Sequence, residues 1–384
     1  MKKIICASLT LMLMFAACVN DDVYDWDTDF ADKTATDTLN IAIHYTNSAV
    51  TVVGDEKGYV AVNGTDVVVR SNTNKFLLLT LSGSASDGSL LVYSWKKWGV
   101  KLNNLSLTNT DGPAINNQCG KAFYIITAAG TTNTLSDDTT YAAAPLNATG
   151  ESVDQKGTLF SEGQIYFQGK GILTVNGNAK NGIASDDYVV FESGTVNVNM
   201  SKTGTNGIKV NDGFTITGGT LNINVEADGA RGIKNGSYTT IDGGTIDIKT
   251  TGNCLIETVD GITDTTSCAG IKSDSLFTMK SGTLTIHSSG DGGKGINCSQ
   301  NIEVKGGTMT VTTIGENEVG KPKAVKSDTG IILSGGSFTA DVEHSWACDN
   351  GTDSDDPADR VTIIGTPDSS TLKLKKKHVF VSFN

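Results

Sequence analysis

Two pairs of polar residues that lie 25 positions apart are the first candidates for chemistry in this sequence. Asp186 and Asp187 are matched one period later by Asn211 and Asp212. On neighbouring strands, roughly 4.7–4.9 Å apart, their carboxylates would repel one another unless a cation lay between them. Carboxylate and amide oxygens are the ligands that Ca²⁺ prefers. The spacing therefore predicts a calcium site, while the alternative is that Asn and Asp simply satisfy tight turns.

Three more acidic residues are candidate ligands for calcium. Asp274 falls in the column of Asp186, at the equivalent position of a later repeat. Asp228 and Asp291 form a second set, and each lies four residues before a recurring glycine. For any one of these residues taken alone, a structural role in a turn is the simpler interpretation.

A column of lysines runs beside these acids. Lys209, Lys234 and Lys272 each stand two residues after the recurring glycine, with an isoleucine between the two. If the isoleucines point inward, strand alternation places the glycines and the lysines together on the outer face. The pattern predicts a bare groove with cationic edges that suits a carboxylated sugar chain. The alternative is a solvated face whose charges are balanced by neighbouring Asp residues.

An aromatic cluster in the segment VYSWKKW supplies a third kind of candidate. Tyr93, Trp95 and Trp98 would offer flat apolar surfaces to sugar rings if they were exposed. Tryptophan near the end of a repeat structure is more often packed inside the protein. Sugar stacking and core packing therefore remain two alternatives for this cluster.

The elements that must position these residues repeat along the chain. The repeated segments are SGTVNVN (193–199), GGTLNIN (218–224), GGTIDIK (243–249), SGTLTIH (281–287), GGTMTVT (306–312) and GGSFTAD (335–341). Their second glycines are 25, 25, 38, 25 and 29 residues apart, and a second marker, Gly-Ile, follows the same irregular pattern. A fixed period of this length is typical of stacked repeat architectures.

Each repeat contains three short runs of alternating apolar and polar residues, separated by turn-forming residues. The alternation predicts inward ladders of aliphatic side chains such as Val196, Leu221 and Ile246. We therefore expect an all-β fold, a right-handed single-stranded parallel β-helix of about 25 residues per coil and about eight or nine coils. The expected segments are N-terminal strands with a cap over 39–98, the β-helix over 99–345, and a closing strand or cap over 346–384.

The N-terminus indicates export and anchoring. Residues 1–17 combine two lysines with an apolar run, and Ala16-Ala17-Cys18 resembles the lipobox of bacterial lipoproteins. An acidic tether follows over 18–38. These features predict a lipid anchor on Cys18, a place at the cell surface on the outer membrane, and partner proteins of a glycan-uptake system. The net charge of −12 argues against nucleic acid as a partner.

Two cysteines suggest a covalent link in one of the longer repeats. Cys254 and Cys268 bracket the 13-residue insertion that lengthens one period from 25 to 38 residues. In an oxidising compartment a disulfide between them would hold this loop, although spacing alone does not fix the pairing.

The whole pattern resembles a known family. The succession DGPAINN, AAGTTNTLSD, GILTVNG and NGIASDD, followed by repeated GIK and GGT units, resembles the calcium-associated parallel β-helix family of carbohydrate-binding domain-containing proteins. That family is similar in fold and calcium use to pectate lyases. The resemblance implies a surface protein that binds acidic or plant-type polysaccharide, with Ca²⁺ as its cofactor.

Three functions remain open at this point. The first is polysaccharide binding without catalysis, which the lack of a recognisable catalytic signature favours. The second is a calcium-dependent polysaccharide lyase, in which Lys234 or Lys272 would remove the proton next to a uronate carboxylate. The third is a structural adhesin whose calcium only stiffens the turns.

Overall fold

The structure is a computed structural model that describes residues 37–383, which belong to a single compact unit. The predicted signal peptide over 1–17, the lipidation site Cys18 and nearly all of the tether over 18–38 lie outside the described residues. Within the described residues no helix is long and apolar enough to span a membrane.

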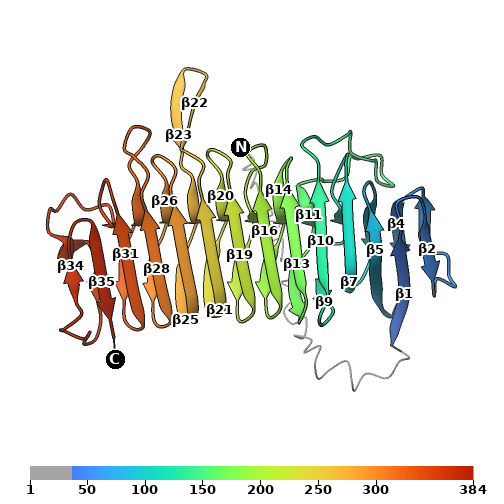
Figure 1. Cartoon of the computed structure of the whole chain (residues 1–384), viewed down its shortest axis with the longest axis horizontal. Helices are drawn as coiled ribbons and strands as arrows, with labels where there is room; N and C mark the ends of the chain where they lie inside the picture. The colour runs from blue at the N-terminus through green and yellow to red at the C-terminus, as the bar shows by residue number, and fades with distance from the viewer. Residues whose placement is uncertain (1–36, 384) are drawn as a thin grey trace, which may run out of the picture. The chain divides into compact units, whose positions relative to one another are not determined.

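The described chain folds as a parallel β-solenoid, in agreement with the predicted fold class (Figure 1). It has about 11 turns of roughly 25 residues. Across residues 37–383 the helical content is one short 3₁₀ turn, Pro357–Arg360. The expected number of eight or nine coils was too low, because strands between 39 and 98 already stack in parallel although their spacing is irregular. Leu39 pairs with Leu77, and Val69 pairs with Val92.

One face of each coil belongs to a sheet that we call the GI sheet, after its Gly-Ile marker. Its first two strands pair antiparallel, and the remaining neighbours pair in parallel. The strands are β3 (Val60–Asn63), β4 (Asp66–Ser71), β6 (Ser89–Ser94), β8 (Ile115–Asn117), β11 (Gly157–Ser161), β14 (Asn181–Ser185), β17 (Ile208–Val210), β20 (Arg231–Asn235), β24 (Ala269–Ser273), β26 (Lys294–Cys298), β29 (Lys323–Ser327) and β32 (Cys348–Asp349).

The other two faces join into one 21-stranded sheet, because several long strands run around the corner between them. The corner strands are β5 (Phe76–Ala85), β7 (Trp98–Asn109), β21 (Tyr238–Thr250) and β25 (Phe277–Ser288). The second face holds β9 (Phe123–Thr127), β12 (Ile165–Gly169), β15 (Tyr188–Phe191), β18 (Gly213–Ile216), β27 (Ile302–Val304), β30 (Ile331–Leu333) and β33 (Thr362–Ile363). The third face holds β10 (Thr132–Asp137), β13 (Ile172–Gly177), β16 (Thr195–Met200), β19 (Thr220–Val225), β28 (Thr308–Thr313) and β31 (Ser337–Val342).

Antiparallel strands cover both ends of the stack. At the N-terminal end β2 (Val50–Val53) pairs antiparallel with β1 (Thr38–Tyr45). At the C-terminal end β35 (His378–Ser382) pairs antiparallel with β31 and with β34 (Lys373–Leu374). These strands satisfy backbone groups that the last coils would otherwise expose.

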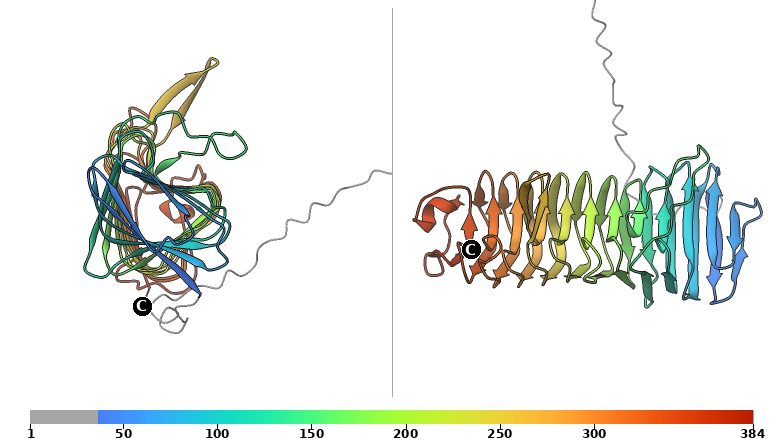
Figure 2. Two further views of the ribbon diagram at one scale, coloured as in Figure 1. Left: turned by 90° about the vertical axis from the view of Figure 1, so that its right-hand side faces the viewer. Right: turned by 90° about the horizontal axis from the view of Figure 1, so that it is seen from above.

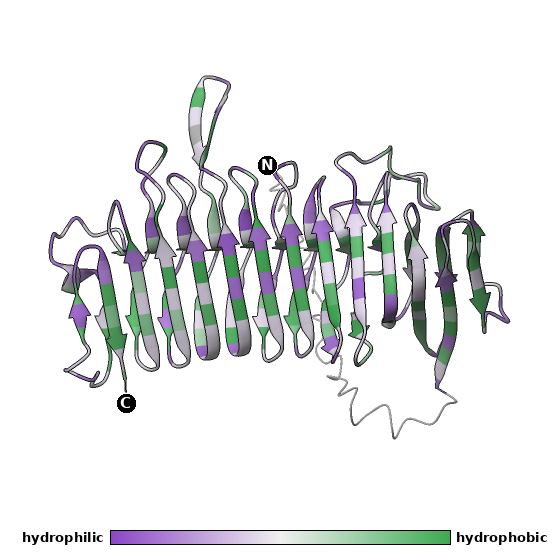
Figure 3. Cartoon of the chain, viewed as in Figure 1, coloured by the Kyte–Doolittle hydropathy of each residue, from purple (hydrophilic) through white to green (hydrophobic). Residues whose placement is uncertain are grey.

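Stacked aliphatic ladders fill the interior. Ile208, Ile233 and Ile271 are directly paired on successive coils and are fully buried. The predicted inward residues Val196, Leu221 and the equivalents that follow them are buried too, and the alternation of apolar and polar residues is visible along the strands in Figure 3. Burying each such side chain contributes about 1.5–3 kcal/mol, so the long core is the main stabilising term.

The glycines of the Gly-Ile pairs face the core, so the expected outward strip of glycines is wrong. A Cβ added to Gly207 would lie 2.6 Å from Ile223 Cγ2, and one added to Gly232 would lie 2.5 Å from Ile248 Cγ2. These glycines stand where the GI sheet leaves a corner, and the backbone of the next coil is equally close there. Strict alternation therefore fails at this position, since the chain is still turning.

Two insertions leave the same corner, the one that leads from the third face into the GI sheet. The first spans 138–156, between β10 and β11. The second carries the hairpin of β22 (Leu255–Val259) and β23 (Ile262–Thr266), between β21 and β24. Figure 2 shows both projecting beyond the stacked coils. They border the GI sheet along one edge.

Candidate functional site

The structure brings three lysines of the GI sheet into one ladder. Lys209 pairs with Lys234, and Lys234 pairs with Lys272, on three consecutive coils. We call these three residues the lysine ladder. The column continues as Asn297 and Lys326 toward the C-terminal end, and as Ala184 toward the N-terminal end. Each ladder side chain is half-buried, and its neighbours in the ladder lie one strand spacing away, about 4.8 Å, along the stack of coils.

A second group of cations lies at the corner edge of the same sheet. Arg231, Lys294 and Lys323, which we call the corner cations, belong to one register column, with Ala269 between the first two. Burial lowers the pKa of all three groups. The sequence analysis did not select them, although each directly precedes the Gly-Ile marker or its degenerate last copy.

Much of this positive charge has no acidic partner. Lys272 Nζ lies 2.7 Å from Asp274 Oδ1, and Lys323 Nζ lies 3.0 Å from Asp349 Oδ2. Within the described part of the chain, Lys209 and Lys234 form no ion pair. Arg231 Nε is buried without a hydrogen-bond partner. The sheet therefore presents a local excess of cations on a protein that is acidic as a whole.

Lys234 lies in the centre of the ladder, between two other lysines. Burial, followed by the charges of Arg231, Lys209 and Lys272, lowers its pKa, and Asp274 opposes this effect only in part. The ammonium form is disfavoured because like charges surround it at short range. A carboxylate that lay over the ladder would relieve this repulsion.

The four predicted calcium ligands do not form one donor set. Asn211 Nδ2 donates to Asp186 Oδ1 over 3.2 Å, so this pair is satisfied across two coils. Asp187 accepts hydrogen bonds from the backbone of Tyr188 and the side chain of Gln164. Burial raises the pKa of Asp187, and Asp212 on the next coil adds to this rise. The two aspartates of coil 186–187 thus face different partners.

The other predicted acids are spread over separate coils. Asp274 does share the column of Asp186, but Asn211 and Gly236 lie between them, so the two are three strand spacings, about 14 Å, apart. One ion cannot bridge that distance. Asp274 is instead paired with Lys272.

Asp228 and Asp291 belong to a ladder that satisfies turn backbone. Asp228 Oδ1 accepts from the backbone nitrogen of Asn253 at 2.7 Å, and Asn253 Oδ1 accepts from that of Asp291 at 2.8 Å. Asp291 Oδ1 in turn accepts from Glu316 at 3.0 Å. These contacts give the two acids the turn role that was the simpler interpretation.

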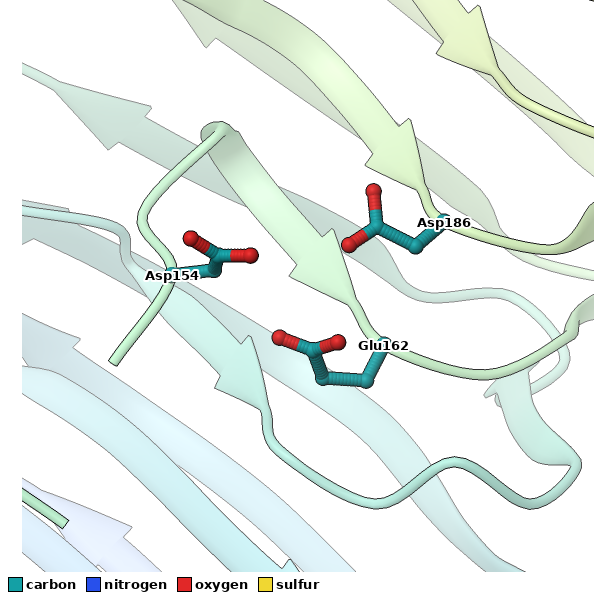
Figure 4. A group of neighbouring side chains, drawn as sticks. All are labelled: Asp154, Glu162 and Asp186. Carbon is teal, nitrogen blue, oxygen red and sulfur yellow. The ribbon is translucent and has the colours of Figure 1, made fainter. Parts of the chain in front are cut away.

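A different carboxylate cluster is present, and it includes Asp186. One oxygen each of Asp154, Glu162 and Asp186 lies within 4.8 Å of the others (Figure 4). Lys156 Nζ lies 2.6 Å from Asp154 and 2.5 Å from Asp186. Burial and the charges of Asp186 and Asp154 raise the pKa of Glu162. Three carboxylates and one ammonium group leave a net negative charge in the cluster. The possible ligand atoms are carboxylate oxygens, so both the charge and the type of ligand atom suit Ca²⁺.

Sequence reasoning missed Asp154 and Glu162 for identifiable reasons. Asp154 belongs to the insertion 138–156, which has no equivalent in other coils. Glu162 belongs to the same column as Asp186 and Asn211, but its coil precedes the regular Gly-Ile series. Only the folding of the insertion back onto the GI sheet brings the three acids together.

The aromatic cluster divides into a core residue and surface residues. Trp98 is 0% exposed, stacks on Phe123 with ring centroids 4.3 Å apart, and donates from Nε1 to Asn117 Oδ1 over 3.0 Å. It cannot be a sugar platform, because it fills the interior of the solenoid. Trp95 is 56% exposed, and Tyr93 is half-buried beside it.

Cys254 and Cys268 lie together at the base of the hairpin. Both are free and buried. A hydrogen bond from Cys268, together with the charge of Lys294, lowers the pKa of Cys254. The predicted disulfide therefore stays a prediction, to which the structure adds that the two thiols are neighbours.

Comparisons with known proteins point to one class. A family profile described as "Carbohydrate-binding domain-containing protein" matches residues 63–341. No curated protein matches the sequence. Among solved structures, a gadolinium derivative of the polysaccharide lyase-like protein from C. thermocellum is 25% identical, with a TM-score of 0.56. The match covers 69% of this chain and 96% of that one.

Proposed function

Since the chain belongs to the family of carbohydrate-binding domain-containing proteins, we propose that it binds a carboxylated polysaccharide along the GI sheet. The observation that supports this proposal is the lysine ladder. Three lysines stand in direct register, and two of them form no ion pair within residues 37–383. A column of like charges at about 4.8 Å spacing is unfavourable unless a ligand neutralises it.

A uronate polymer fits this column in charge. Successive carboxylates of an extended chain would meet successive ammonium groups, and each contact is a charge-assisted hydrogen bond. The overall charge of −12 repels such a polymer at long range, so the attraction acts only near the ladder and the corner cations. We expect affinity to build up from several weak subsites, as in multivalent binding.

Calcium is a second part of the proposal, and Asp154, Glu162 and Asp186 are the residues that would hold it. Their oxygens are close enough to share one ion, and Lys156 would have to give up its contacts to them. When bound, Ca²⁺ would offer positive charge and open coordination positions to a ligand carboxylate. The cluster lies at the end of β11 and β14, on the N-terminal side of the lysine ladder.

A matched pair of polymers tests the binding proposal. Polygalacturonate and its fully methyl-esterified form have the same backbone, but only the first carries carboxylates. We expect the protein to bind polygalacturonate in affinity electrophoresis and to lose that binding as ionic strength rises. It should show no binding to the methyl-esterified polymer. Equal binding of both polymers would show that carboxylates are not recognised and would refute the proposal.

A lyase activity is a second candidate function, and the lowered pKa of Lys234 favours it. A neutral amine is a base, and burial together with the neighbouring cations increases the neutral fraction of Lys234. In this reaction Lys234 Nζ would take the proton at C5 of a uronate. The electron pair would form a C4–C5 double bond, and the C4–O bond to the next sugar would break. The leaving oxygen would take a proton from water.

The two functions differ in a simple measurement. A lyase would produce an unsaturated uronate, and ultraviolet absorbance would rise with time when calcium and polygalacturonate are supplied. Lys234→Gln should abolish that rise. Binding without any rise over a long incubation would leave the protein as a binding module.

Anchoring at the cell surface is proposed on sequence grounds alone. The lipobox-like Ala16-Ala17-Cys18 and the acidic residues that follow it support a lipidated surface protein. Incorporation of a labelled fatty acid by the full chain, and its loss in Cys18→Ser, would test this. Partner proteins of a glycan-uptake system would be sought by cross-linking on intact cells.

A further inference from the structure

A separate cavity lies at the N-terminal end of the GI sheet, on the strands β4 and β6. It has a volume of about 600 Å³, which is within the range of small-ligand sites. Its lining combines aromatic rings with uncharged polar groups. The lining residues include Arg70, Asn72, Tyr93, Trp95, Gln118 and Ala148. Tyr93 is four strands away from Lys209 along the sheet, about 19 Å, so the lysine ladder takes no part in this cavity.

Trp95 forms a fixed and open wall of the cavity. Its Nε1 donates to the backbone oxygen of Thr73 over 2.5 Å, so the orientation of the indole is set. Lys96 Nζ, which donates to the backbone oxygen of Asn74, lies 5.8 Å from the ring centroid. The residue nevertheless remains 56% exposed. An exposed indole that is held in place offers a flat apolar surface at little conformational cost.

Tyr93 contributes a polar atom that has no partner. Its hydroxyl is buried and forms no hydrogen bond within the described chain. The guanidinium carbon of Arg70 lies 4.8 Å from the centre of the Tyr93 ring, so the ring is packed in place while its hydroxyl is not satisfied. A buried hydroxyl without a partner is costly, and a ligand hydroxyl would satisfy it.

The charges around the cavity are of both signs, with one cation in the lining and a cluster of acids next to it. Arg70 is the one charged residue of the lining, and it already stacks on Tyr93. Gln118 Nε2 donates to the backbone oxygen of Asp154, whose carboxylate belongs to the acidic cluster next to the cavity. The acidic cluster lies between this cavity and the lysine ladder, so the carboxylates of the cluster would repel a uronate bound in the cavity.

We propose that this cavity is a second carbohydrate site, which takes a neutral pyranose ring stacked on Trp95. The apolar face of the ring would lie on the indole, and its hydroxyls would meet Tyr93, Asn72 and Gln118. Ala148 places the insertion 138–156 at the rim, so the same loop that supplies Asp154 also borders this site. The proposal goes beyond the binding of uronate by the lysine ladder and does not depend on it.

The test measures binding of neutral polymers by the full chain and by two matched aromatic variants. Mixed-linkage β-glucan, galactomannan and xyloglucan serve as probes in affinity electrophoresis, and cellohexaose serves in calorimetry. Trp95→Ala should weaken binding of the neutral probes about tenfold, because one stacking contact is lost. Tyr238→Ala is the control, since Tyr238 is also exposed, at 41%, but lies on the second face. It should bind as the parent does.

Further variants separate this site from the lysine ladder. The triple change of Lys209, Lys234 and Lys272 to Gln should leave neutral binding unchanged, and Tyr93→Phe should weaken it several-fold. The proposal is overturned if the parent binds none of the four probes or if Trp95→Ala binds them normally. It is also overturned if Trp95→Ala loses polygalacturonate to the same degree as β-glucan, because the cavity would then be an end of the acidic site.

Discussion

Replacing Lys234 by glutamine should weaken ligand binding and at the same time stabilise the protein. Lys234 has a lysine on each side in the ladder, Lys209 and Lys272, and directly opposed like charges cost roughly 0.2–1 kcal/mol per pair. Asp274 compensates Lys272 at 2.7 Å, which reduces one of the two repulsions. The net gain on removing the charge is therefore up to about 1 kcal/mol, or an apparent Tm rise of about 1–2 °C for a chain of this size.

The pH dependence of this gain follows from the sign of the shift. The pKa of Lys234 is lowered in the folded state, by burial first and by Arg231, Lys209 and Lys272 after that. Below the lowered pKa the side chain is charged in both states, and the repulsion destabilises only the folded one. As pH rises above the lowered pKa, the folded form loses its proton and the penalty shrinks, and it is gone above the pKa of the unfolded chain. The advantage of Lys234→Gln should therefore be largest below the lowered pKa and decrease as pH rises above it.

Binding should change in the opposite direction. A lost charge-assisted hydrogen bond at a partly exposed site corresponds to about tenfold in affinity for polygalacturonate. Lys249→Gln, on the third face, makes the same change in net charge and is the control. Parallel calorimetry and electrophoresis would give both quantities. A variant that binds as well as the parent, or that loses binding because it is less stable, would refute this account of the ladder.

Three further predictions concern the rest of the molecule. Burial and the charges of Asp186 and Asp154 raise the pKa of Glu162, so its ionised form destabilises the fold above that pKa. Glu162→Gln should therefore raise the Tm measured in chelator, and it should remove the increase in Tm that we expect when Ca²⁺ is added to the parent. If calorimetry shows the same increase in Tm with Ca²⁺ in the variant, the acidic cluster does not hold the ion. Gly232→Ala should lower the free energy of unfolding, measured by denaturant titration, by about 1–3 kcal/mol, because the added Cβ would lie 2.5 Å from Ile248 Cγ2. An unchanged free energy of unfolding would contradict the inward placement of this glycine. Under oxidising conditions Cys254 and Cys268 should form a disulfide, which should raise the free energy of unfolding by about 3 kcal/mol relative to the variant with both cysteines changed to serine. Peptide mapping that finds another pairing would contradict this prediction.

The repeat pattern was sufficient to predict the solenoid and its inward ladders. Each Gly-Ile marker repeats at the interval at which a coil returns to the same sheet, so the register of Lys209, Lys234 and Lys272 follows from the sequence alone. The aliphatic ladders follow for the same reason, because alternation in a strand leaves only one face for the core.

Positions at the corners were harder to predict. Gly207 and Gly232 face inward although alternation places them outside, since the backbone is still turning where they stand. Trp98 lies in a coil without the regular markers, and its burial depends on stacking against Phe123 of the next coil. Such packing depends on neighbours that the local pattern does not identify.

The sequence alone determined which residues share a column in the regular coils, because the period equals the length of one turn. Only the tertiary structure decided which columns meet. Asp154 reaches Glu162 and Asp186 because the insertion 138–156 folds back over the sheet, and Tyr93 and Trp95 line a cavity because that same insertion borders them. Contacts of this kind are made by segments outside the repeat, whose course is set by packing against the finished stack and not by any periodicity in the chain.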